Sequence, residues 1–165
     1  MGLRLQASFW IALSAGLCAL VLQLFIEAPP VDFADSTHKT QLFSLLLLAL
    51  ISGFFAGWLL GPILGQPGAG GLLLGLIGAF LATILTGAVA GGVVGAVRVF
   101  LRDGFDPVGM FGEALAEGGM TSFVVTRLLI GSLPMLCLWF VLFLGVHLLM
   151  YRARRILVSQ QEWKL

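Results

Sequence analysis

Charge is scarce in this 165-residue chain: 10% of its residues are Asp, Glu, Lys or Arg, whereas 59% are hydrophobic. Soluble domains carry about 25% charged residues, so this chain has too little polar material to cover a water-exposed surface. The mean hydropathy is correspondingly high, at +1.07. A net charge of +1 supplies no basic field, which excludes an electrostatically driven nucleic-acid-binding protein. The composition therefore predicts an integral membrane protein in contact with a lipid bilayer.

Residues that usually carry chemistry are also rare. The two cysteines, Cys18 and Cys137, lie inside apolar runs and form no CxxC pair, so no thiolate metal site is predicted. His147 is the only histidine inside a long apolar run, since His38 lies in a polar stretch, and one chain cannot supply a bis-histidine haem site. The two histidines also cannot join a Ser–His–acid set in one layer. We expect no enzymatic activity, no metal and no cofactor.

Four apolar runs are long enough to cross a hydrocarbon core, which takes about 20 helical residues. The second run should end at Gly61-Pro62, and the short link after it makes runs two and three an antiparallel hairpin. Pro134 should kink the fourth run. The predicted fold is a single-domain, all-α bundle of four transmembrane helices. The runs cover about residues 7–26, 41–60, 72–100 and 123–151, with outer loops at 27–40 and 101–122 and a tail at 152–165.

The first apolar run has a second interpretation as a cleaved signal peptide. It is long for such a segment, and Glu27-Ala28-Pro29-Pro30 after it is a poor cleavage site. We therefore favour a retained transmembrane helix.

Charge predicts the orientation of the bundle. With both termini in the cytoplasm, Arg4, Lys164 and the cluster Arg152, Arg154 and Arg155 lie on that side, and we interpret the cluster as a cytoplasmic anchor. The opposite side then has fewer basic residues, namely Lys39, Arg98 and Arg102, and seven of the eight acidic ones. The expected location is a bacterial inner membrane.

The outer loop contains a pattern typical of a short amphipathic helix. Asp106 suits an N-cap, Pro107 a first helical position, and Gly118-Gly119 a helix end. Between them, Val108, Phe111, Ala114 and Leu115 fall on one side and Glu113 and Glu117 on another. We expect this helix to lie in the membrane interface, with its two carboxylates solvated.

Arg127 is the one charge clearly inside an apolar run. Its long side chain can reach the head groups near the outer end of run four. An alternative is a polar or anionic contact, with Glu113, Glu117 or an anionic substrate as partner and Gln23 of run one as a polar neighbour.

Glycine is abundant, with 22 residues, and much of it recurs at intervals of four. The stretch TGAVAGGVVGAV at 86–97 lacks the lysine of a P-loop, because no lysine occurs between Lys39 and Lys164. Small residues at this spacing let the backbones of membrane helices approach closely. The predicted packing positions are Gly53, Gly57 and Gly61 in run two, and Gly71, Gly75, Ala79, Thr83, Gly87, Gly91 and Gly95 in run three.

The length of the second series has a geometric consequence. Each step of four residues turns about 40° around a helix, so seven positions turn about 240°. One straight neighbour cannot cover that arc. The third run should therefore contact more than one helix, in the bundle or in another protein.

The stretches GFFAGWLLG at 53–61 and RVFLRDGFDPV at 98–108 resemble the small four-span tellurite-resistance membrane proteins of bacteria. The resemblance implies a four-span membrane protein. No residue role or activity is carried over from it, because the glycine series of run three departs from that group.

The sequence thus favours a small accessory, assembly or stress-related subunit that packs through its glycine-rich helices. Its partner would be another membrane protein or a further copy of the chain. The alternative is a subunit of an oligomeric channel or small-solute transporter. A water-filled path usually has a polar lining, and run three offers only Thr83 and Thr86 for one.

Overall fold

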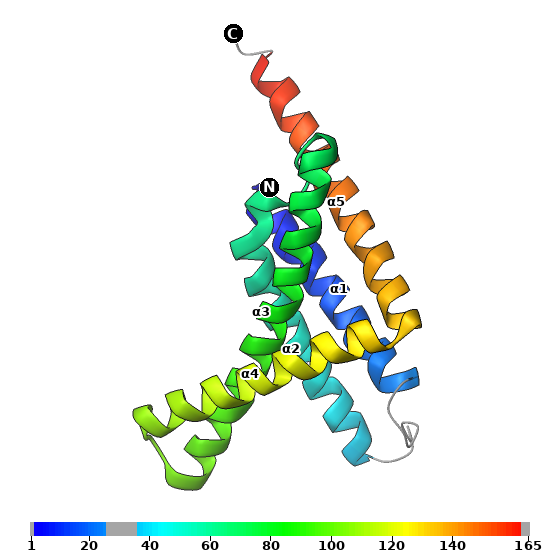
Figure 1. Ribbon diagram of the computed structural model, residues 1–165. Helices are drawn as coiled ribbons and strands as arrows, with labels where there is room; N and C mark the ends of the chain where they lie inside the picture. Colours follow the sequence, from blue (N-terminus) through cyan, green and yellow to red (C-terminus); the bar gives the residue numbers. More distant parts are fainter. Residues whose placement is uncertain (1, 26–35, 163–165) are drawn as a thin grey trace.

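The computed structural model describes residues 2–25 and 36–162. Within these ranges the chain forms helices joined by short links, and no strand is present. Figure 1 shows their arrangement. The helices are α1 (Leu3–Phe25), α2 (Ser36–Leu60), the 3-10 turn η1 (Gly61–Ile63), α3 (Gly68–Asp103), α4 (Pro107–Gly131) and α5 (Leu133–Glu162).

Four of these helices are long and apolar enough to cross a membrane, as the sequence predicts. The candidate spans are Leu3–Leu22, Leu42–Ile63, Gly68–Asp103 and Leu133–Ser159. They alternate in direction, so the first turn of α1 and the last turns of α5 lie at the same end of the molecule (Figure 1). The all-helical fold with four such helices is confirmed.

The boundary between the last two helices differs from the prediction of one run over 123–151. The chain leaves the helical conformation at Ser132, which has φ −120° and ψ 108°. Pro134 lacks the N–H that a continuous helix would donate to the Ile130 carbonyl oxygen, and its ring would clash with that carbonyl. The proline therefore separates two helices instead of kinking one. The fourth candidate span begins at Leu133.

Helix α4 also corrects the prediction of a short helix in the outer loop. It begins at Pro107 with Asp106 in the N-cap position, as expected, although the Asp106 side chain forms no capping hydrogen bond. It then continues through Gly118-Gly119 to Gly131. Gly118 is buried against α3, where an added Cβ would lie 2.7 Å from the carbonyl oxygen of Ala88. Packing against α3 therefore outweighs the local tendency of glycine to end a helix.

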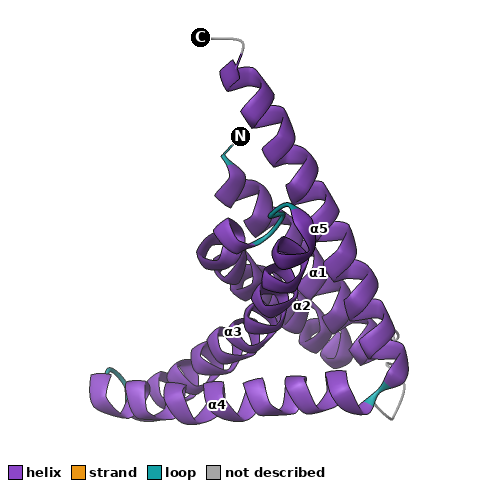
Figure 2. Ribbon diagram, turned by 45° about the horizontal axis from the view of Figure 1, so that its top comes forward, coloured by secondary structure: helices purple, strands orange, loops and turns teal. Residues whose placement is uncertain are grey.

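The helices pack as two antiparallel pairs and one returning helix. α1 packs mainly against α2, and α3 packs mainly against α4. α4 runs across the end of the bundle at which α5 begins, and α5 returns along the molecule to the end where the chain starts (Figure 2). α1 and α3 have few contacts with each other. This separation leaves internal space between the two pairs.

Candidate functional site

The glycines of α2 and the first residue of η1 contact α1. A Cβ added at Gly53 would lie 3.0 Å from the Ala12 Cα atom, and one at Gly57 would lie 2.6 Å from the Ser8 Cα atom. At Gly61 the neighbour is the Cβ atom of Ala7, at 2.8 Å. The absent side chains thus let α1 and α2 approach closely along about two helical turns.

The glycines of α3 are divided between different neighbours. Gly87, Gly91 and Gly95 face α4; at Gly95 an added Cβ would lie 2.6 Å from the Glu113 carbonyl oxygen. Gly75 instead faces α5, where an added Cβ would lie 2.5 Å from the His147 Nδ1 atom, and Gly71 faces Gln66 of the preceding link. Successive segments of α3 therefore contact different neighbours. This is expected, because glycines spaced four apart rotate gradually around the helix axis.

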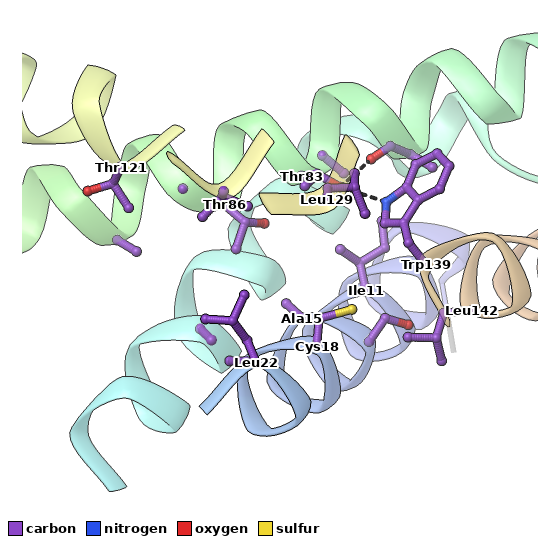
Figure 3. A pocket seen from close by; sticks show the side chains of 18 of the residues that line it. Ile11, Ala15, Cys18, Leu22, Thr83, Thr86, Thr121, Leu129, Trp139 and Leu142 are labelled. Carbon is purple, nitrogen blue, oxygen red and sulfur yellow. Dashed lines mark hydrogen bonds between the residues drawn. The ribbon is translucent and has the colours of Figure 1, made fainter. Parts of the chain in front are cut away.

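The two remaining positions of the series, Ala79 and Thr83, line a cavity. The cavity has a volume of about 360 Å³ and lies among α1, α2, α3, α4 and α5. Figure 3 shows Ile11, Ala15, Cys18 and Leu22 of α1 on one side and Thr83 and Thr86 of α3 on another. Its remaining walls are also mostly aliphatic or aromatic, as with Leu48 of α2, Leu129 of α4 and Trp139, Leu142 and Phe143 of α5.

Several polar groups of the cavity wall already have partners. The Thr83 hydroxyl donates to the Ala79 carbonyl oxygen at 3.0 Å and accepts a hydrogen bond from the Trp139 indole N–H at 2.9 Å, as Figure 3 shows. Ser14 donates to the Trp10 carbonyl oxygen at 2.8 Å. A hydroxyl that is hydrogen-bonded to its own backbone offers little to a solute. The cavity is therefore suited to an apolar molecule more than to an ion.

The carboxylates of α4 lie beside an arginine of α3. Arg98 Nη1 donates to Glu117 Oε1 and lies 3.5 Å from Glu113 Oε1. Both carboxylates keep partial exposure to solvent, and α4 also packs them beside Arg98 of α3. This ion-paired cluster is still partly exposed, and such pairs contribute about 0–1 kcal/mol to stability.

Arg127 lies on α4 and is exposed. Glu113 and Glu117, which the sequence suggests as its partners, are taken up by Arg98. Within the part of the chain that the structure describes, Arg127 forms no hydrogen bond or ion pair. The side chain of Gln23 lies outside the described residues.

The basic cluster after the fourth span has a role that the sequence does not reveal. Arg154 of α5 donates from Nε to the Leu64 carbonyl oxygen at 3.0 Å and from Nη2 to the Pro62 carbonyl oxygen at 2.6 Å. Arg152 and Arg155 are exposed. Buried His147, which precedes this cluster on α5, accepts a hydrogen bond from the Gly65 N–H at 3.4 Å. α5 thus holds the link between α2 and α3.

Replacing Arg154 by methionine should weaken this attachment. The side chain keeps its apolar length but loses donors to two carbonyl oxygens, and hydrogen bonds from charged groups contribute about 1.5–3 kcal/mol each when well shielded. Because Arg154 is partly exposed, we expect a loss of about 1–2 kcal/mol in the free energy of unfolding. Thermal unfolding in detergent measures it. Arg155→Met is the matched control, and equal midpoints for the two variants would contradict the assignment.

The described residues contain no group of three or more His, Cys, Asp or Glu side chains that could hold a metal ion. Cys18 lines the cavity by itself, and Cys137 is exposed on α5. The cavity, to which all five α-helices contribute side chains, is therefore the candidate site.

Comparison with known proteins finds no protein similar to this chain. No family model, no curated protein and no solved structure matches the chain.

Proposed function

We propose that this chain is a non-catalytic accessory or assembly subunit of a bacterial inner-membrane complex, with both termini in the cytoplasm. The observation that carries the proposal is the face of α4 that points away from α3. This outer face of α4 is defined by Val108, Phe111, Gly112, Leu115, Ala116, Gly119, Met120 and Phe123.

Large apolar side chains project from this face. Phe111 is 67% exposed, Leu115 63% and Phe123 64%. α4 is not among the four helices that are apolar enough to span a membrane. We place it in the interface on the outer side of the inner membrane, opposite the cytoplasm. Apolar side chains on a helix at that depth require a cover of acyl chains or of protein.

Small residues on the same face favour protein as the cover. Gly112, Ala116 and Gly119 lie within about 60° of one another around the helix. Nothing lies within 4 Å of a Cβ added at Gly112 or Gly119. A strip of small residues between large ones lets a second helix approach closely, which is how helices associate in lipid. The partner proposed is therefore a helix of another membrane protein.

A channel or transporter subunit is supported less well. Of the two hydroxyls that a path along α3 would use, Thr83 is bonded to Trp139. The cavity beside them is lined mainly by aliphatic and aromatic side chains. A conducting path needs polar groups that can replace the water around a solute.

The outer face can be tested with a pair of glycine substitutions. Gly119→Leu should block the approach of a partner helix, whereas Gly145→Leu places the same side chain at an open position of α5. A photo-reactive residue at position 116 is used to detect the neighbour in the native membrane, after which the protein is extracted in mild detergent. We expect a crosslink to one defined membrane protein, lost in Gly119→Leu and retained in Gly145→Leu.

Two outcomes would contradict the proposal. Crosslinking to lipid alone in the unaltered chain would show that no protein covers the face. A crosslink to a second copy of this chain would show that the protein forms a homo-oligomer and is not an accessory subunit of another protein. Both variants should be at least as thermally stable as the unaltered chain, because each substitution enters open space and leucine favours a helix over glycine.

A further inference from the structure

The central cavity is large for a space inside a helical bundle. Its volume of about 360 Å³ lies within the range of about 300–1,000 Å³ typical of ligand sites. An apolar cavity of about 150 Å³ in a protein core stays dry and already admits benzene. A larger apolar space beside a bilayer is expected to hold an apolar molecule.

The shape of the cavity favours a linear molecule. Its wall on α3 extends from Ala79 to Val94, which corresponds to about 22 Å along a helix. This length exceeds half of a hydrocarbon core, which is about 30 Å thick. A volume of about 360 Å³ spread over such a length leaves a long and narrow space. A single extended hydrocarbon chain fits that shape better than a fused ring system.

The two ends of the cavity differ in polarity. Near Phe143 and Val146 of α5 the wall is apolar. At the opposite end, Glu117 and Thr121 of α4 both line the cavity and lie beside Gly91. A molecule with an apolar tail and a polar end is therefore favoured over a pure hydrocarbon, with its polar end towards α4.

The cavity adjoins a groove between α2 and α3. Leu48 and Val94 line both spaces, and the groove continues past Ser44 to Arg98. Arg98 donates from Nη1 to Glu117. A guanidinium has five N–H donors in all, so others remain for a ligand. The groove thus gives a lateral route from lipid and ends at Arg98, whose remaining N–H groups can donate to a carboxyl or ester oxygen. The Ser44 hydroxyl instead donates to the Thr40 carbonyl oxygen at 2.8 Å.

We propose that the cavity binds one long acyl chain, which enters between α2 and α3. The chain lies along α3 with its terminal methyl group towards Phe143, and its carboxyl or ester end lies near Arg98. Two sources share this chemistry: a free fatty acid and one chain of a membrane phospholipid. The proposal does not depend on the outer face of α4.

Trp139 provides the measurement, because bromine atoms on an acyl chain quench tryptophan fluorescence on contact. Trp139 lines the cavity, whereas Trp58 is on α2 and 43% exposed. Two single-tryptophan proteins are made, each by replacing the other three tryptophans with phenylalanine. Each is placed in a nanodisc of unbrominated phosphatidylcholine and titrated with dibrominated stearic acid or, separately, with dibrominated phosphatidylcholine.

We expect saturable quenching of Trp139 at one probe chain per protein, several-fold stronger than that of Trp58 at the same mole fraction. Trp58 should show only the gradual quenching caused by surrounding lipid. The probe that saturates Trp139 at the lower mole fraction identifies the source of the chain.

Cavity-filling substitutions supply the control. Ala90→Phe and Ala19→Phe fill the cavity from α3 and from α1 respectively, and either should abolish the saturable component. Ala69→Phe places the same ring at an exposed position of α3 and should leave the saturable quenching of Trp139 unchanged. Equal, non-saturable quenching of Trp139 and Trp58 would overturn the proposal. So would saturable quenching that persists in both filled variants with an unchanged thermal midpoint.

Discussion

Replacing Gly57 by leucine should destabilise the bundle strongly, by about 3 kcal/mol or more, which is at or above the usual upper limit for overpacking a core. A Cβ at this position would lie 2.6 Å from the Ser8 Cα atom and 2.7 Å from the Ala7 carbonyl oxygen. Both are backbone atoms, so no side-chain rotation relieves the contact. α1 and α2 would have to separate, and the contacts at Gly53 and Gly61 would be lost together with this one.

The matched control is Gly145→Leu, because an added Cβ there meets nothing within 4 Å. Glycine costs a helix about 1 kcal/mol relative to good helix formers, so this variant should unfold at the same temperature or higher. Unfolding in detergent, followed by circular dichroism and size-exclusion chromatography, measures both. A Gly57→Leu protein as stable as the control would show that α1 and α2 do not meet as described.

The second large effect is expected at Gly65, in the link between α2 and α3. Gly65 has φ +70° and Gly68 has φ +77°, a region that costs an L-residue about 1–2 kcal/mol. Alanine at either position incurs this cost. At Gly65 the added Cβ would also lie 2.5 Å from the Met150 carbonyl carbon and from the Tyr151 nitrogen of α5, whereas at Gly68 it meets nothing within 4 Å.

Gly65→Ala should therefore lower the free energy of unfolding by about 3–5 kcal/mol, well beyond the strain alone. Gly68→Ala should lower it by about 1–2 kcal/mol. The comparison isolates the contact with α5, because the backbone strain is common to both variants. Chemical denaturation of the two proteins in the same detergent tests it. Similar losses for both would mean that α5 does not press against the link.

The sequence predicts the α2–α3 hairpin well because its signals are local. Pro62 cannot continue a helix, and α2 does end at Leu60. The division of the α3 glycines between neighbours follows from the geometry of a single helix. The end of α4 is different: Gly118-Gly119 is a good local stop, but Gly118 is held in the helix by Ala88 of α3, which is 30 residues away in the chain.

The cavity could not be predicted in the same way. Its lining consists of ordinary apolar residues such as Ala15, Leu48 and Leu129, contributed by separate helices. None of them belongs to a motif, and the space exists only because α1 and α3 are held apart. The contacts of Arg154 with Pro62 and Leu64 likewise join residues about 90 positions apart. A cluster of basic residues after a span predicts orientation, and gives no indication of such contacts.

The attachment of α5 to the α2–α3 link has a consequence for biogenesis. α1 and α2 contain their whole interface within the first 61 residues, so this hairpin can form while the remainder is still being translated. α5 is synthesised after the other four α-helices, and it brings Arg154 to the link and Trp139 and Phe143 to the cavity wall. Packing of α5 therefore closes the cavity and attaches this helix to the α2–α3 link in the same step.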